Sequence, residues 1–259
     1  MSTSNQSSKA QTELPRSVSK VSELVNDAIN TFQSFFFKAP VTIRVGVGAR
    51  QRDFFIAEDL LRKHSPFFDA ALNVAWKESD TNIVELPEDD VNAFQIYSCW
   101  LYGLSPFVEP DPKMEKQQID LEYHRLGPAW DLGHKILDRD FCDMIIDRML
   151  DLASCTSHWP ALELIHIFKL CSENDPSRLL LCDVYTHVSD LKWYNDPSEG
   201  MDVEVWRAIA TTLFKMMETK NPKQTRSKRP WKKDRCQYHW HTKDGKECYK
   251  TKYSPSKSS

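Results

Sequence analysis

The apolar residues of this sequence change their spacing partway along the chain, and this change restricts the fold class. Val41, Ile43 and Val45 alternate with polar residues, the period of a strand with one buried face. Similar short segments follow near 53–57 and 82–86. Farther along, apolar residues recur every three or four positions, which is the period of a helix. Strands that precede helices predict an α+β fold and argue against alternating strand–helix units.

Individual residues predict where helices begin and end. Ser65 and Pro66 are typical of a helix N-cap and first helical position, because proline lacks the N–H that would be unpaired there. The pair Asp89–Asp90 predicts the cap of the next helix, which carries Phe94. Pro128 after Gly127 predicts a break between two helices. The predicted later helices cover 118–126, 128–136, 140–153, 160–172, 177–191 and 202–219.

Charge is distributed unevenly along the chain. Residues 220–259 carry 13 basic and 3 acidic side chains, whereas residues 1–219 carry 21 basic and 34 acidic ones. This asymmetry indicates either a basic tail that contacts nucleic acid or import receptors, or a tail that folds back onto the acidic body. Few aromatic residues interleave with the basic ones, so binding to nucleic acid is not expected. The run that resembles an import signal, and that could equally be a solvated linker, contains Lys228, Arg229, Lys232 and Lys233.

The same segment contains the ligand types that a tetrahedral zinc ion prefers. Cys236, His239, His241 and Cys248 supply two thiols and two imidazoles within thirteen residues. Gly245 predicts a turn that brings the second thiol back toward the first. The spacing matches no established zinc finger, and the two histidines would point to opposite faces of a strand. We therefore keep two interpretations, a zinc site or a short β-hairpin packed on the helical region, and expect no other cofactor.

An ordered set of motifs resembles the BTB/POZ domain, in particular that of the large fungal group of such proteins. The resemblance covers roughly residues 38–153. Pro40 and Glu58 depart from it, because transcription-factor members carry an Asp and an Arg at these places. The motifs are Phe54–Phe68, Trp76-Lys-Glu-Ser79, Ile83–Asp90, Phe94-x-x-Tyr97-x-x-Trp100-Leu-Tyr102, Leu132–Asp138 and Phe141–Asp147.

The resemblance implies a small sheet flanked by helices that serves as a protein-interaction module. An all-helical C-terminal region and a short basic Cys/His tail would follow this module. The expected organisation is a disordered N-terminus at 1–20, a BTB/POZ domain at 21–153 with its core at 38–153, a helical region at 154–219 and a tail at 220–259.

Two candidate partner-binding sites follow. Phe35, Phe36 and Phe37 end a predicted helix, and adjacent helical residues are about 100° apart, so they cannot all face inward. Their partner is either a second copy of the chain, as in a homodimer, or the C-terminal helices. The resemblance also implies a cullin contact at Trp76 and Glu78, where an exposed Trp would be a large apolar anchor. The alternative is that Trp76 packs in the core.

We expect a non-catalytic protein-interaction function with self-association. The alternatives are a substrate adaptor of a cullin-type ubiquitin ligase and a nuclear regulatory protein that acts through the basic tail. No phosphate-binding glycine loop, metalloprotease motif or hydrolase motif is present, so we expect no enzyme. The sequence lacks a membrane-length apolar segment and a secretory signal, which favours the cytoplasm or the nucleus.

Overall fold

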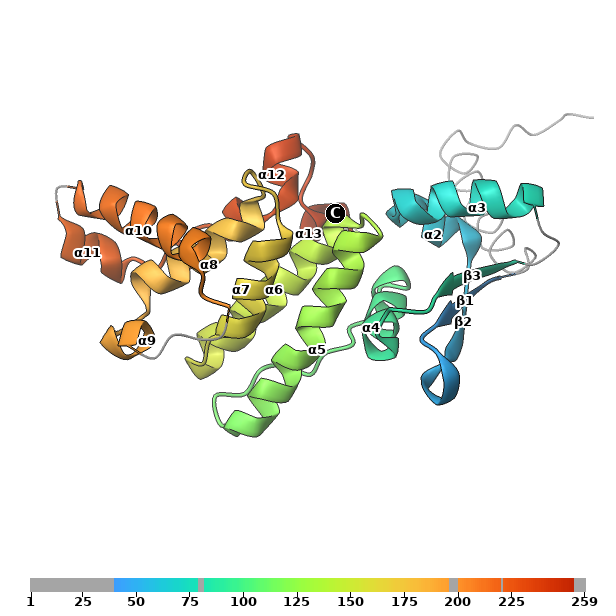
Figure 1. Ribbon diagram of the computed structural model, residues 1–259, viewed down its shortest axis with the longest axis horizontal. Coiled ribbons are helices and arrows are strands. Elements are labelled where there is room, and N and C mark those ends of the chain that lie inside the picture. The colour runs from blue at the N-terminus through green and yellow to red at the C-terminus, as the bar shows by residue number, and fades with distance from the viewer. Residues whose placement is uncertain (1–39, 79–81, 196–199, 220, 254–259) are drawn as a thin grey trace, which may run out of the picture.

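The computed structural model describes four stretches of the chain, shown in colour in Figure 1. The predicted disordered N-terminus and the candidate contact residues Phe35, Phe36 and Phe37 lie outside them. The described stretches are 40–78, 82–195, 200–219 and 221–253, with the backbone alone at 74–78 and 224–226.

A three-stranded sheet forms one end of the molecule (Figure 1). Its central strand, β1 (Val41–Val45), pairs antiparallel with β2 (Arg52–Ile56) and parallel with β3 (Ile83–Leu86). A 3₁₀ turn at Gly48–Arg50 connects β1 to β2. The three alternating apolar residues of β1 are completely buried, which confirms the alternation read from the sequence.

Two helices, α2 (Glu58–His64) and α3 (Pro66–Glu78), lie between β2 and β3 in the chain. Ser65 separates the two helices, and its hydroxyl oxygen accepts a hydrogen bond of 3.1 Å from the Phe68 N–H. The same hydroxyl donates 2.6 Å to the Ile136 carbonyl, seventy-one residues later in the sequence. The predicted N-cap is thus confirmed, and it also joins the strand-bearing region to the later helices.

Helix α4 (Val91–Leu101) connects the sheet to the helical part of the molecule. Asp90 caps it by accepting 2.8 Å from the Ala93 N–H, as the sequence predicts. The Phe94 ring lies 4.7 Å from the Phe54 ring of β2, measured between centroids. The buried aromatic side chains of α4 therefore pack against the sheet at one end of the molecule. They also contact the helices, since the Tyr97 and Phe141 centroids lie 5.0 Å apart.

One long helix, α5 (Lys116–Lys135), replaces the two helices predicted on either side of Gly127. The predicted break at Pro128 is wrong. Proline removes the donor to the carbonyl one turn earlier, at His124, but both residues lie on the exposed face. Water can reach that carbonyl, so the helix continues through the proline.

Helices α5 and α6 (Arg139–Thr156) approach each other closely. Gly133 makes this possible, because a Cβ at this position would lie 2.7 Å from Phe141 Cδ1 and 2.9 Å from Cys142 Sγ. Helix α6 also extends beyond the predicted range of 140–153. Helix α6 lies in the middle of the helical part of the molecule (Figure 1), and most of its side chains are buried.

Further helices build the end of the molecule opposite the sheet (Figure 1). Asp175 caps α8 (Pro176–His187) by accepting 2.9 Å from the Ser177 N–H. The helix predicted at 177–191 is too long, because α8 ends at His187 and a separate short helix follows. The bounds are α7 (Ala161–Leu170), α8 (Pro176–His187), α9 (Leu191–Asn195), α10 (Val203–Met217) and α11 (Pro222–Ser227).

The last described segment returns from α11 to the middle of the molecule (Figure 1). It contains 3₁₀ turns at Pro230–Lys232 and Cys236–Tyr238, and the helices α12 (Trp240–Asp244) and α13 (Tyr249–Lys252). The predicted β-hairpin is wrong, because this segment is helical throughout its regular parts. Gly245, with a φ of 64°, ends α12 and turns the chain toward α13.

The observed fold is mixed α+β and mostly helical, with one continuous cluster of buried apolar residues. The cluster includes residues of β1, of the central helices and of the last segment, Tyr238 among them. Within the described residues, each helix falls short of the combined length and hydropathy that crossing a bilayer requires.

Candidate metal centre

The C-terminal segment arranges the four candidate ligands through short local structures. Cys236 begins a 3₁₀ turn, and its N–H donates 2.9 Å to the Asp234 side chain. His239 is extended, with φ −103° and ψ 145°, and His241 lies in the first turn of α12. After the turn at Gly245 the chain comes back, so that Cys248 immediately precedes α13. The histidines therefore leave the chain from different local structures.

These four residues form one cluster that could bind a metal ion. Each offers one ligand atom, and the four atoms all lie within 4.8 Å of one another. The ring centroids of His239 and His241 are 5.4 Å apart. His239 is completely buried, and the other three side chains are half-buried. Since the residues do not lie on a strand, the expected divergence of the two imidazoles does not occur.

Several polar atoms of the cluster are buried without a hydrogen bond. Among the described residues, the cluster atoms without a hydrogen-bond partner are the two ring nitrogens of His239 and the Nε2 atom of His241. A buried polar atom without a partner costs about 1–3 kcal/mol, so native structures rarely contain several together. A metal ion bound to one nitrogen of each ring would satisfy two of these atoms.

The two thiols also favour a cation between them. Burial and the neighbouring Cys248 raise the pKa of the Cys236 thiol to about 11. Two thiolates at this separation repel each other, which raises the pKa. A divalent cation lowers the pKa of both thiols instead, because it binds their deprotonated form. The donor set of two sulfurs and two nitrogens suits a tetrahedral ion.

A row of aspartates on α6 holds the segment that bears the cluster. The four aspartates are three, four and four residues apart, so they share one face of the helix. Each accepts a hydrogen bond from the C-terminal segment. The contacts are Asp140 with Lys252 and Tyr253, Asp143 with the Trp240 N–H, Asp147 with Tyr249 and Lys250, and Asp151 with Arg235.

Asp147 is the member of this row that lies beside the cluster. Its Oδ1 is 3.4 Å from His239 Nε2, and its Oδ2 is 2.6 Å from Lys250 Nζ. Burial alone would raise the pKa of the Asp147 carboxyl, but interactions with His239, Lys250 and Tyr249 outweigh burial and lower the pKa to about 2. A carboxylate beside one imidazole nitrogen leaves the other for an ion, an arrangement that orients metal-binding histidines.

This aspartate row is the functional feature that the sequence reasoning missed. The spacing of Asp140, Asp143, Asp147 and Asp151 is visible in the sequence, next to the apolar stripe of the same helix. Nothing in the sequence pairs it with a segment about a hundred residues later. Of the two expectations for the basic tail, folding back onto the acidic body matches these contacts.

The other candidate residues lie elsewhere. Trp76 and Glu78 belong to the last turn of α3, where the structure describes the backbone alone, so their exposure stays a prediction. The basic run contains Trp231, which is buried. The Trp231 ring lies 4.8 Å from the Trp159 ring, measured between centroids. Lys228, Lys232 and Lys233 are exposed around it, and Arg229 is half-buried.

No protein-family model matches the chain, and no curated protein matches it.

Proposed function

We propose that the cluster of Cys236, His239, His241 and Cys248 binds one structural zinc ion that fixes the C-terminal segment on α6. The single observation that carries this proposal is the meeting of four ligand atoms within 4.8 Å. Four protein ligands complete a tetrahedron, which is the signature of structural rather than catalytic zinc. When bound, the ion supplies four strong bonds between parts of the chain that have little regular structure of their own.

The segment needs stabilising contacts such as these metal bonds because its helices are short. Helices α12 and α13 have 5 and 4 residues, and isolated helices of this length are unstable in water. Hydrogen bonds to the aspartates of α6 attach the segment to the rest of the molecule. The ion would join the part of the segment before Gly245 to the part after it. Asp147 would support the site by accepting a hydrogen bond from the His239 ring nitrogen that does not bind the ion.

Elemental analysis of the purified full chain tests this proposal. We expect one zinc per chain, retained through dialysis without added metal. Cys248→Ser should lose the ion, whereas Cys99→Ser should keep it, because Cys99 is a half-buried cysteine of α4 outside the cluster. A wild-type protein that stays free of metal in the presence of equimolar zinc contradicts the proposal, as does equal retention by both variants.

For the whole protein, we propose a non-catalytic interaction module of the BTB/POZ type that associates with itself. The order of elements supports this reading: two strands, the helix pair around Ser65, a third strand and then helices. The ordered motifs of 38–153 give the same indication. The edge strand β2 leaves the apolar side chain of Phe55 64% exposed, where a second chain could cover it.

The solution mass of the full chain tests self-association. We expect a dimer, and a shift toward monomer when Phe35, Phe36 and Phe37 are together replaced by Ser. The matched control replaces Leu121, an exposed residue of α5, by Ser and should remain dimeric. A wild-type monomer at all accessible concentrations contradicts self-association but leaves the zinc proposal unaffected.

A further inference from the structure

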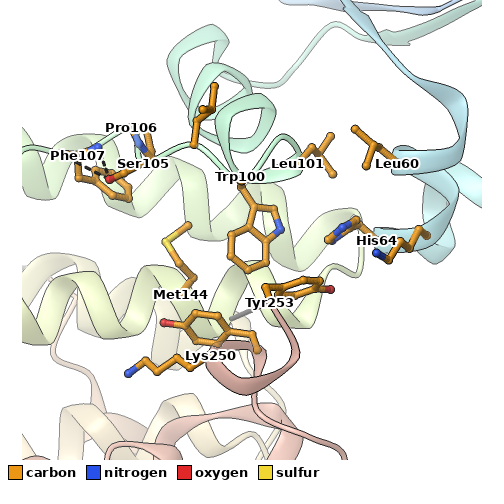
Figure 2. A pocket seen from close by; sticks show the side chains of 14 residues that line it. Leu60, His64, Trp100, Leu101, Ser105, Pro106, Phe107, Met144, Lys250 and Tyr253 are labelled. Atoms are coloured by element: carbon orange, nitrogen blue, oxygen red, sulfur yellow. Dashed lines mark hydrogen bonds between the residues drawn. The ribbon is translucent and has the colours of Figure 1, made fainter. Parts of the chain in front are cut away.

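A cavity of about 580 Å³ lies between the sheet-bearing part of the molecule and the C-terminal segment. Residues of α2, of the end of α4, of the loop after it, of α6 and of the C-terminal segment line this cavity (Figure 2). Its volume is in the range of pockets that bind small molecules or single side chains. No residue of the proposed zinc site lines it.

The walls of the cavity are mainly aromatic and aliphatic. Figure 2 shows Trp100 at the centre, with Pro106 and Phe107 on one side and His64 on the other. The Tyr253 ring stacks on His64 at a centroid distance of 5.3 Å and meets Trp100 edge-on at 5.4 Å. These side chains form a preformed apolar surface that fits one bulky apolar group.

Among the described residues that line the cavity, the charged side chains are positive, whereas Asp138 and Asp140 accept hydrogen bonds from the lining residues Trp100 and Tyr253. The described residues that line it include Lys63 and Lys250 and no carboxylate. Lys250 is paired with Asp147, but Lys63 is exposed and forms no ion pair within the described stretches. The Lys63 ammonium lies 5.7 Å from the centre of the Tyr253 ring, at the edge of the cavity. An anionic group would therefore be attracted to this edge.

We propose that this cavity binds an acidic segment of a partner protein, which inserts one bulky apolar side chain beside Trp100. A carboxylate of the segment pairs with Lys63. Leu104, 63% exposed, lines the cavity and covers the inserted side chain. This inference rests on the proposed function, since it names the chemistry of one partner for the interaction module.

The proposed zinc site controls one wall of the cavity. Helix α13 starts immediately after Cys248 and supplies Tyr249 and Lys250 to the lining, and Tyr253, the residue that follows the helix, also lines the cavity. Release of the ion frees this helix from the rest of the segment, so the partner's affinity depends on zinc. The aromatic contacts of Trp100 with Tyr249 and Tyr253 then lose their fixed geometry.

Fluorescence anisotropy with a labelled peptide tests the inference. The probe is the pentapeptide Asp-Asp-Phe-Asp-Asp, and the comparison peptides replace its Phe by Ala or its four Asp by Lys. The zinc-loaded full chain should bind the probe saturably, and both comparison peptides at least about tenfold more weakly. Equal binding of all three peptides, or no binding of the probe, overturns the inference.

Two pairs of matched variants locate the site. Lys63→Glu and Leu104→Glu should each weaken binding at least about tenfold. The controls are Lys215→Glu, a change of another exposed lysine, and Leu121→Glu, a change of a leucine that is also 63% exposed. Both controls should bind as wild type does, and any equal loss in a variant and its control overturns the assignment to this cavity.

Zinc content and the far-ultraviolet circular dichroism spectrum of every sample separate this inference from the proposed function. If a folded chain that holds one zinc ion does not bind the probe, the cavity inference is wrong and the proposed zinc site is unaffected. A Cys248→Ser chain without metal should bind the probe at least about tenfold more weakly. If it binds as tightly as wild type, the wall does not depend on zinc, and that part of the inference is wrong.

Discussion

The Tyr249 hydroxyl donates 2.7 Å to the Asp147 carboxylate, across 102 residues of sequence, and both groups are buried. This bond fastens the last helix of the described chain to the centre of α6. It predicts that Tyr249→Phe lowers the free energy of unfolding by about 1–3 kcal/mol, because the carboxylate loses a buried donor. Urea unfolding measures the change.

A double-mutant cycle with Asp147→Asn isolates the pair. The coupling energy should be about 0.5–3 kcal/mol, since the two groups touch. Tyr102→Phe is the control, because the Tyr102 hydroxyl accepts a bond from the Ala57 N–H at an exposed position. Additive effects of Tyr249→Phe and Asp147→Asn would show that the two groups do not stabilise each other.

Removal of the metal should loosen the C-terminal segment and spare the sheet. After treatment with a chelator, we expect the backbone amides of 236–253 to exchange hydrogen faster, while those of β1 keep their wild-type rates. The reason is that α12 and α13 are too short to persist without tertiary support. Hydrogen exchange read by mass spectrometry checks this, and unchanged protection of 236–253 would refute it.

Trp231 should be the main apolar anchor of the basic run. It is 1% exposed and packs against Trp159 and His187. Trp231→Ala should destabilise the protein by about 3–5 kcal/mol, because it leaves a large cavity. Trp231→Phe should cost less, since it keeps an aromatic ring and removes a buried N–H that has no partner among the described residues. Equal unfolding midpoints of both variants and wild type would contradict this role.

Asp138 should make stability depend on pH. Its side chain is 2% exposed, and burial raises the pKa of its carboxyl to about 7, although the Phe141 and Trp100 N–H groups partly oppose this. His64 faces it at 3.7 Å and has its own pKa lowered to about 4 by burial, so His64 stays neutral above that pH.

The sign of the effect follows from proton binding. Between pH 4 and pH 7 the folded state holds a proton at Asp138 that the unfolded state has released, so stability falls as pH rises through this window. Asp138→Asn should remove that component, which amounts to on the order of 2–4 kcal/mol. Urea unfolding of both proteins at several pH values measures it. Parallel stability profiles would contradict the prediction.

Local signals in the sequence determined much of the architecture. The alternation in β1, the Ser65–Pro66 helix start and the Asp90 cap all depend on residues within a few positions of one another, and each is confirmed. The ligand types of the metal cluster could also be read directly. Such features are predictable because a capping hydrogen bond or a strand's alternation of apolar residues involves only residues that are close together in the sequence.

Other features depended on the tertiary structure. Pro128 stays inside α5 because that face of the helix meets water, and the sequence does not say which face does. Likewise, the divergent imidazoles of His239 and His241 converge only because the segment is wound on the aspartates of α6 instead of forming a hairpin. The sequence by itself determined which groups are present and several of the short elements that they form. Only long-range packing, whose partners are about a hundred residues apart, decided which of them meet.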